Sequence, residues 1–413
     1  MQLKKQLKSL FGYDDFRINQ REIITNLMNG NNTLVLKATG GGKSLLFQLP
    51  TLVNNWRCVV VTPTIALMND HVKELTQLPA YEQGEFKVFA LNSDTSAKNK
   101  RLIREELEKG NFNFLFISPE TLTSRTNGIL EILERIGIDL LVIDESHLVV
   151  EWSQFRGAYL WIKYAIEIIK PFVVMALTAT VNKDSQAFLQ NEFLIDTVFK
   201  DSFNRPNMNI YFIEKESDFS VGGRIISYIK KNPNKKGIIY TNTTKKVNEL
   251  HEFLVSKGVS CGKYHGGLSS TQKNNEKAIN QDGFINNEFN WLVGTDAFGM
   301  GINIPNIDCV ISECLPPSIP IMWQWFGRGG RDGREFFACC YYNSNDIDNW
   351  LFIQKNKKTG ENSPRDIDNL ALVYDVVTEN AVCTKQLILI CLGEGSLSNC
   401  GKCNYCRKIK NNG

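Results

Sequence analysis

The sequence lacks the features that would place a protein in a membrane. It contains no run of eighteen apolar residues, the length that a membrane-spanning helix needs. Its first residues, MQLKKQLKSLFGYDDF, contain no apolar stretch of the kind found in signal peptides. We therefore expect an intracellular protein, cytoplasmic in a prokaryote or nuclear in a eukaryote, with no membrane partner.

The sequence also has no large excess of one charge, because it contains 47 basic and 44 acidic residues and its net charge is +3. This balance leaves a nucleic-acid partner open, since a basic groove can be local. No repeat, collagen-like or low-complexity segment is present. The 11 cysteines are an odd number. In a chain without a signal peptide they favour reduced thiols and a metal site over a disulfide framework.

Short apolar runs alternate with amphipathic segments such as 97–109 and 126–136. Continuous apolar runs are typical of strands in parallel sheets that are covered on both faces. The pattern predicts an α/β protein with two tandem, doubly wound parallel-sheet lobes. The expected strands are 33–37, 58–63, 112–119, 138–145 and 172–180 in the first lobe, and 236–241, 289–295, 307–312 and 335–342 in the second.

After about residue 345 the strand pattern fades. Helical stretches at 346–356 and 366–379 lead to a cluster of cysteines. With a linker at 201–209, we predict three domains: a first lobe (1–206), a second lobe (207–345) and a small C-terminal metal module (346–413).

The segment TLVLKATGGGKSLLFQL (33–49) reads as strand, loop and helix. Its glycines let the backbone turn N–H groups toward a phosphate, and a helix that begins at Lys43–Ser44 points its positive end there. In this pattern Lys43 reaches the β- and γ-phosphates of ATP and Ser44 holds Mg²⁺. Lys37 stands where the first glycine of the general pattern would be. The alternative is a glycine-rich turn.

Asp144 and Glu145 end the predicted strand IDLLVIDE. The carboxyl ends of parallel strands face the ligand crevice. Asp144 is expected to hold Mg²⁺, and Glu145 to polarise the attacking water. Paired acids also begin many helices. The phosphate loop earlier in the chain favours the catalytic interpretation.

The segment QWFGRGGRDG places Arg328 and Arg331 just before the last predicted strand of the second lobe. An arginine supplied by another lobe can stabilise the charge that develops on a transferred γ-phosphate. The alternative is a solvated basic turn.

Four cysteines near the C-terminus have the spacing C-x16-C-x2-C-x2-C, and they are Cys383, Cys400, Cys403 and Cys406. Four thiolates fit a closed tetrahedral Zn²⁺ site. Free structural thiols are the alternative. Cys391 lies at apolar helical spacing and is expected in the core. Cys58, Cys309, Cys314, Cys339 and Cys340 lie in or near predicted strands and are also expected to be small core residues.

Taken in order, these motifs resemble those of the RecQ family of superfamily 2 DNA helicases, from about Leu3 to Cys406. The segment FGYDDFRINQ (11–20) resembles the adenine-recognition element of that family. The resemblance implies that Tyr13 stacks on the base, Arg17 packs against it and Gln20 hydrogen-bonds its edge. The segment ATGGGKS resembles P-T-G-G-G-K-S, with Ala38 in place of proline, and assigns Thr39, Gly40, Gly41 and Gly42 to the nucleotide.

Other segments follow the family pattern in both lobes. VTPTIALMNDHV (61–72) and ISPETL (117–122) resemble motifs that grip the DNA backbone. DESH (144–147) resembles D-E-A-H, and ALTAT (176–180) resembles the coupling motif. The segments 237–247, 264–268 and 295–302 resemble motifs of the second lobe. In QWFGRGGRDG, Trp325 replaces a glutamate, and the cysteine tetrad matches the zinc module of the family.

Two departures from the family pattern affect the expected activity. The aromatic loop that senses single-stranded DNA reads LVVEWSQFRGAYL (148–160), with one residue fewer between Trp152 and Phe155. We expect Trp152, Phe155 and Arg156 to contact DNA, with Tyr159 also in the loop; ordinary core packing is the alternative for the two aromatics. The sequence also stops after the cysteine module, where most relatives continue into a winged-helix domain. We therefore expect translocation with weak unwinding, and long duplexes that need a partner. The alternative is that the zinc module itself splits the duplex.

The resemblance implies an ATP-dependent 3′-to-5′ helicase or translocase that acts on single-stranded or tailed duplex DNA. Its cofactors would be ATP, Mg²⁺ and Zn²⁺. The setting would be DNA repair or recombination, or a larger complex in which a protein partner supplies strand separation or loading. An ATP-switched nucleic-acid clamp and an RNA remodelling helicase stay open as alternatives.

Overall fold

The protein is represented by a computed structural model that describes residues 2–37, 40–124, 126–152, 161–179, 183–269, 275–298, 304, 306–355, 360–394 and 398–412. The chain divides into two compact units, Met1–Ser202 and Phe203–Gly413. The division into three domains, with a separate module from residue 346, stays a prediction.

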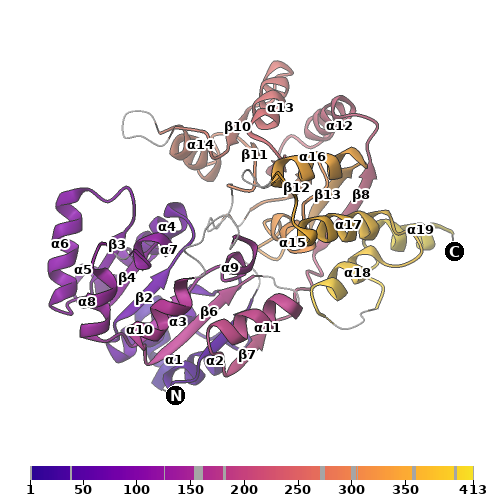
Figure 1. The fold of residues 1–413 in the computed structure, drawn as a ribbon. Helices are drawn as coiled ribbons and strands as arrows, with labels where there is room; N and C mark the ends of the chain where they lie inside the picture. Colours follow the sequence, from indigo (N-terminus) through magenta and orange to yellow (C-terminus); the bar gives the residue numbers. More distant parts are fainter. Residues whose placement is uncertain are drawn as a thin grey trace. The chain divides into compact units, whose positions relative to one another are not determined.

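Unit 1 contains a seven-stranded sheet in which all strands are parallel, in the order β3-β4-β2-β5-β6-β1-β7. Figure 1 shows this unit in indigo to magenta. The strands are β1 (Thr33–Leu36), β2 (Cys58–Val61), β3 (Val88–Leu91), β4 (Phe114–Ile117), β5 (Leu140–Ile143), β6 (Val173–Thr178) and β7 (Thr197–Lys200). Every residue of β1, β2, β4, β5 and β6 is buried. Because successive side chains point to opposite faces, both faces of the sheet are covered.

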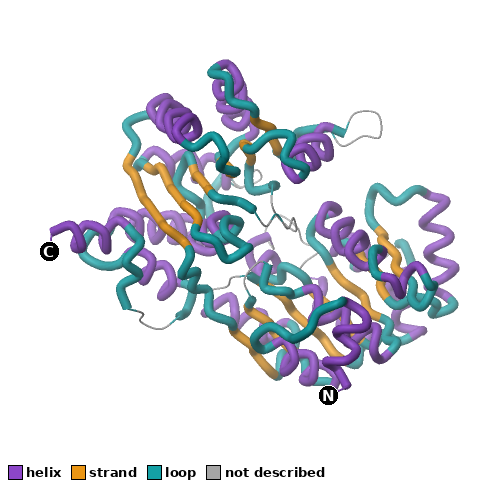
Figure 2. Tube along the Cα trace, turned by 180° about the vertical axis from the view of Figure 1, so that it is seen from behind, coloured by secondary structure: helices purple, strands orange, loops and turns teal. Residues whose placement is uncertain are grey.

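Two helices of unit 1 precede the first strand and the others lie between strands in the chain; together they pack on the sheet (Figures 1 and 2). One core cluster joins apolar residues of the first four helices, such as Leu7, Phe47 and Met68, to alternate strand residues such as Val35 and Val142. The helices are α1 (Gln2–Phe11), α2 (Gln20–Met28), α3 (Ser44–Asn54), α4 (Ile65–Thr76), α5 (Pro79–Glu82), α6 (Ala97–Glu108), α7 (Pro119–Leu122), α8 (Ile129–Ile136), α9 (His147–Trp152), α10 (Ile162–Ile169) and α11 (Lys183–Glu192).

Unit 2 contains a six-stranded parallel sheet in the order β10-β11-β9-β12-β13-β8. Its strands are β8 (Met208–Glu214), β9 (Gly237–Tyr240), β10 (Cys261–Tyr264), β11 (Trp291–Gly294), β12 (Cys309–Ser312) and β13 (Phe336–Tyr342). Its helices are α12 (Asp218–Lys231), α13 (Thr244–Ser256), α14 (Glu276–Ile285), α15 (Ile319–Phe326), α16 (Asn345–Gln354), α17 (Pro364–Thr378), α18 (Thr384–Cys391) and α19 (Asn404–Asn412).

The two parallel-sheet lobes confirm the predicted fold class, and every predicted strand is present. Four further strands, β3, β7, β8 and β10, were not predicted, and they are the edge strands of the two sheets. Strand β8 begins at Met208, so the end of the predicted linker 201–209 is strand. Among the described residues, no helix is long and apolar enough to cross a membrane.

Candidate active site

The predicted phosphate loop and carboxylate pair meet at the carboxyl edge of the unit 1 sheet. Strand β1 leads through the glycines to Lys43 and α3, and β5 leads directly into Asp144 and Glu145. Only β6 separates these two strands in the sheet. Lys43 Nζ lies 3.6 Å from Glu145 Oε1. The structure therefore brings the loop lysine and the carboxylates together where parallel sheets bind their ligands.

The backbone at Glu145 has a left-handed conformation, with φ of 46°. Residues other than glycine rarely adopt this region, and those that do cluster at functional sites. Two hydrogen bonds hold the turn: the Glu145 N–H donates to Asp144 Oδ1 at 2.9 Å, and the Ser146 N–H donates to the Leu177 carbonyl at 2.7 Å. Strand β6 therefore fixes the backbone of the turn that carries Glu145.

The Lys43 ammonium is buried and makes no hydrogen bond to any residue that the structure describes. Buried polar groups are almost always hydrogen-bonded, so an exception calls for a ligand or another explanation. The phosphate oxygens of a nucleotide are acceptors of the right charge for this ammonium. Ser44 is the first residue of α3, where a hydroxyl is well placed to reach the same ligand.

Asp144 is buried, and burial alone would raise the pKa of its carboxyl. His71, the Lys43 charge and the Glu145 N–H outweigh that effect, so the pKa of Asp144 is lowered. His71 Nε2 lies 3.2 Å from Asp144 Oδ2, and the His71 ring stacks on the Phe116 ring with centroids 5.4 Å apart. Asp144 is therefore ionised at neutral pH, as a ligand of Mg²⁺ must be.

The contact of His71 with Asp144 was not foreseen in the sequence, although His71 lies in the segment 61–72. The buried residues of α4 are Leu67, Met68, His71 and Leu75, which form an apolar stripe at helical spacing. A histidine on that stripe was the available signal, because a buried imidazole needs a polar partner.

A second histidine joins the carboxylate pair to β6. His147 Nδ1 lies 3.4 Å from Glu145 Oε2 and 3.0 Å from Thr178 Oγ1. Thr178 belongs to the segment 176–180, which was matched to the coupling motif. The contact therefore links the two motifs through one imidazole ring.

The predicted adenine-recognition residues touch the glycine loop. Arg17 Nη1 donates to the Gly40 carbonyl at 2.6 Å, and Gln20 Nε2 donates to the Gly42 carbonyl at 2.9 Å. Gly42 has φ of +78°, and a Cβ atom there would lie 2.6 Å from Gln20 Nε2. The positive φ favours glycine at this position, because residues with a Cβ atom rarely adopt it. Tyr13 is 56% exposed and is free to stack on a planar ligand; Thr39 lies outside the described residues.

Arg328 and Arg331 follow α15 in unit 2. Arg328 is buried, and its Nε and Nη1 have no hydrogen-bond partner among the described residues. Trp325 stacks on Tyr240 with ring centroids 4.7 Å apart and donates to Asp296 Oδ1 at 3.1 Å. The tryptophan at this position of the motif is therefore a core residue. The action of the two arginines on the nucleotide stays a prediction.

The expected aromatic DNA contacts cannot be placed. Phe155, Arg156 and Tyr159 lie outside the described residues, and only the backbone of Trp152, at the end of α9, is described. Their contact with DNA stays a prediction.

A separate cavity of about 700 Å³ opens where β2, β3 and β4 end. Residues of the two predicted backbone-gripping segments line it, including Thr64 and Ser118, which cap α4 and α7. Three basic side chains of α6, Lys100, Arg101 and Arg104, line it as well. Helix N-termini, hydroxyls and cations are the groups that bind phosphates of a nucleic-acid backbone.

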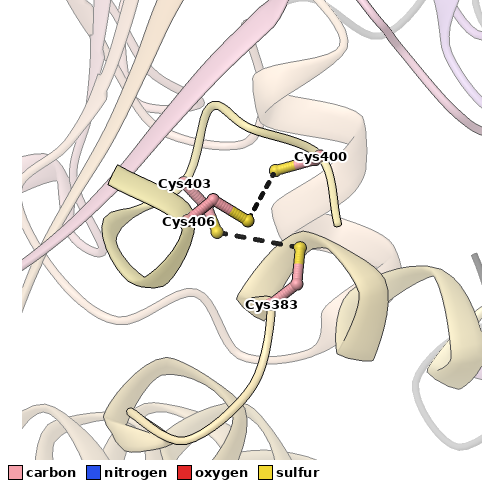
Figure 3. Close-up of side chains that lie close together, drawn as sticks. All are labelled: Cys383, Cys400, Cys403 and Cys406. Carbon is pink, nitrogen blue, oxygen red and sulfur yellow. Dashed lines mark hydrogen bonds between the residues drawn. The ribbon is translucent and has the colours of Figure 1, made fainter. Parts of the chain in front are cut away.

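The four predicted zinc ligands converge in unit 2 (Figure 3), with their ligand atoms all within 4.8 Å of one another. The Sγ atoms of Cys403 and Cys383 are 3.7 Å apart, and those of Cys400 and Cys406 are 3.9 Å apart. A tetrahedron with Zn–S bonds of about 2.3 Å has S···S edges of about 3.8 Å. The thiols therefore fit one tetrahedral Zn²⁺.

The cysteine cluster packs on the edge strand of unit 2. The Ile210 N–H donates to the Lys402 carbonyl at 3.2 Å, and the Phe212 N–H donates to Asn404 Oδ1 at 2.9 Å. Arg407 lies 4.0 Å from the centre of the Tyr211 ring. Unpaired edge strands are prone to aggregation. The segment held by the cysteines therefore protects β8.

Two helicase families match the chain: DEAD/DEAH box helicase over residues 17–188 and Helicase conserved C-terminal domain over residues 222–333. The chain is 32% identical to the ATP-dependent DNA helicase RecQ of Bacillus subtilis and 31% identical to that of Haemophilus influenzae. Each alignment covers 97% of this chain. It spans 66% and 62% of those two relatives. A protein of Acanthamoeba polyphaga mimivirus, provisionally named an ATP-dependent RNA helicase, is 32% identical over 99% of this chain and 73% of its own length.

Solved helicase structures share the fold. The chain superposes on Saccharomyces cerevisiae Dbp5 bound to RNA and ADP BeF3 with a TM-score of 0.68, 18% identity and coverage of 91% of this chain and 97% of that chain. For the helicase MrfA bound to DNA the TM-score is 0.66 and the identity 19%, and the superposition covers 96% of this chain and 59% of MrfA. These likenesses support two RecA-like lobes.

We predict that hydrolysis depends on Glu145 and binding on Lys43. Glu145→Gln should lower kcat by roughly 10²–10⁴-fold, because an amide cannot act as a base, while ATP still binds. Lys43→Ala should weaken ATP binding, since it removes the buried cation of the loop. Steady-state ATPase assays and equilibrium binding of a fluorescent ATP analogue measure both effects. Near-native turnover by Glu145→Gln would disprove the assigned role.

We predict that the cysteine cluster holds one structural zinc. Elemental analysis should find one zinc per chain. Cys403→Ser should lower the melting temperature by roughly 10 °C and cause aggregation, because it opens the metal site and frees the edge of β8. The ATPase rate per folded molecule should change little.

Cys391→Ser is the matched control, because Cys391 lies in α18 outside the cluster. It should keep the zinc and the melting temperature. A stable wild-type protein without metal would contradict the zinc assignment.

Proposed function

Because the chain belongs to the RecQ family of superfamily 2 helicases, we propose that it is an ATP-driven motor that moves along single-stranded DNA. Mg²⁺-ATP would bind at the carboxyl edge of the unit 1 sheet. Lys43 would contact the phosphates, Ser44 and Asp144 would hold Mg²⁺, and Glu145 would polarise the attacking water.

The observation that carries this proposal is the buried cluster of Lys43, Asp144 and Glu145. The ammonium and the carboxylates lie together, with the nearest ion pair at 3.6 Å. His147 connects Glu145 to Thr178 of β6. A change at the γ-phosphate could therefore pass from Glu145 through His147 to Thr178 at the end of β6. This is the connection that a motor needs between hydrolysis and movement.

DNA is the proposed substrate because the bacterial relatives are named DNA helicases. The cavity beside α6, with its three cations and two capped helix starts, supports contact with a phosphate backbone. Contacts of this kind read little sequence and weaken with salt. RNA is the second candidate, since the mimivirus relative is named an RNA helicase.

The finer parts of the proposal rest on the family. They are 3′-to-5′ movement, a role in DNA repair or recombination, an intracellular location, and action of Arg328 and Arg331 on the γ-phosphate. Zn²⁺ at the cysteine cluster is supported by the S···S distances.

The test is the ATPase rate with single-stranded DNA, duplex DNA and RNA of one sequence. Single-stranded DNA should stimulate hydrolysis at least about tenfold more than RNA, which corresponds to about 1.4 kcal/mol of preference. Lys100→Gln/Arg101→Gln should weaken DNA activation and reduce the slope of log affinity against log salt by about 0.7 for each lost phosphate contact.

Lys230→Gln/Lys231→Gln is the control, because it removes the same charge from the exposed end of α12. It should leave DNA activation and the salt slope unchanged. Stronger stimulation by RNA would select the RNA candidate. Stimulation by no nucleic acid would contradict the proposed function.

A further inference from the structure

A buried ion pair lies beside the nucleotide loop of unit 1. Lys37 directly follows β1 and is 3% exposed. Its ammonium pairs with the Asp201 carboxylate and donates to the Ile18 carbonyl at 3.1 Å. Lysine is rarely buried without a specific partner, because burial of a charge is costly. An apolar residue of similar size would fill this position at lower cost.

The other partner, Asp201, is fixed by the sheet. It directly follows β7, and its N–H donates to the Leu36 carbonyl of β1 at 2.9 Å. Its Oδ1 accepts a hydrogen bond from Asn19 Nδ2 at 2.9 Å, while Oδ2 pairs with Lys37. One carboxylate therefore holds both the lysine and Asn19.

Ile18 and Asn19 are the two central residues of the segment 17–20. The ends of this segment, Arg17 and Gln20, donate to the carbonyls of Gly40 and Gly42 in the phosphate loop. The segment is closed on itself, because the Arg17 N–H donates to Gln20 Oε1 at 2.8 Å. Asn19 has φ of 62°, a left-handed conformation that needs support from its surroundings.

We propose that Lys37 and Asp201 are positioning residues that hold the segment 17–20 in place, and so set how strictly the site selects the adenine base. Lys37 fixes the carbonyl of Ile18, and Asp201 fixes the side chain of Asn19. Together they set where the amide of Gln20 and the guanidinium of Arg17 lie. This inference rests on the proposed ATP site and names the part of the chain that governs its selectivity.

The phosphate side of the site has independent supports. Lys43 directly precedes α3, and the acid pair is held by the turn after β5 and by the hydrogen bond to Leu177 of β6. None of these contacts involves Lys37 or Asp201. Arg17 and Gln20 do contact the loop carbonyls of Gly40 and Gly42. A loss of the ion pair should therefore disturb base selection strongly and triphosphate binding only slightly. Misplaced hydrogen-bonding groups lower selectivity strongly, because a site that hydrogen-bonds its ligand discriminates through those groups.

The test is Asp201→Asn, which keeps the shape of the side chain and removes its charge. The KM for ATP should rise about tenfold with kcat within about twofold, and the ratio of kcat/KM for ATP over GTP should fall about tenfold. Inhibition by tripolyphosphate, which has no base, should keep its Ki within about twofold. A structural defect of the whole lobe would weaken tripolyphosphate together with ATP.

Three further variants make the result specific. Asp201→Glu keeps the carboxylate and should restore much of the ATP preference. The double variant Lys37→Met/Asp201→Asn also removes the ammonium that Asp201→Asn leaves unpaired. It should therefore recover thermal stability while the ratio of kcat/KM for ATP over GTP stays low. If Asp201→Asn does not fold, the double variant is measured in its place. Glu106→Gln breaks an exposed pair with Lys87, 2.8 Å apart in the same unit, and should change nothing.

An unchanged ATP over GTP ratio in Asp201→Asn and in the double variant would overturn the inference, as would an equal loss of ATP and tripolyphosphate binding. In both cases the wild type would still hydrolyse ATP, so the proposed function would stand. A wild-type chain that neither binds nor hydrolyses ATP would instead overturn the proposed function, and this inference with it.

Discussion

The arrangement on which the rest of this structure depends is the buried charge cluster of Lys43, Asp144 and Glu145. Charges inside a protein are stable only when they are paired and hydrogen-bonded. Here the lysine lies 3.6 Å from one carboxylate, and His71 and His147 contact the two acids. A nucleotide with its metal would supply the phosphate oxygens and the cation that this cluster is suited to bind. The residues that pair with these buried charges are therefore needed both for the stability of the fold and for catalysis.

The parallel sheet makes the cluster possible. All strands of unit 1 run in one direction, so the loops after β1, β5 and β6 open at one edge. Backbone hydrogen bonds from Asp144 to Val61 at 3.0 Å and from Ser146 to Leu177 at 2.7 Å fix the acid pair between neighbouring strands. Unit 2 repeats the architecture, and its cysteine cluster covers the edge strand β8. The two helicase domain matches fall one in each unit.

The sequence predicted the central strands and missed the edges for a physical reason. Central strands are buried on both faces and read as continuous apolar runs, whereas β7 is half-buried throughout and β8 alternates. The loop lysine and the acid pair were predictable because phosphate binding demands a fixed local spacing. The partners His71 and Asp201 were not, since each meets its site from far along the chain. The apolar stripe of α4 signals that His71 is buried, but it does not identify the group that His71 contacts.

The central claim is that the cluster drives directional movement on single-stranded DNA. The most direct measurement is displacement of streptavidin from biotin placed at the 5′ or the 3′ end of a single strand. The account predicts ATP-dependent displacement from the 5′ end by the wild type, little from the 3′ end, and none by Glu145→Gln. ATP hydrolysis stimulated by DNA with no displacement from either end would contradict it and would identify a clamp.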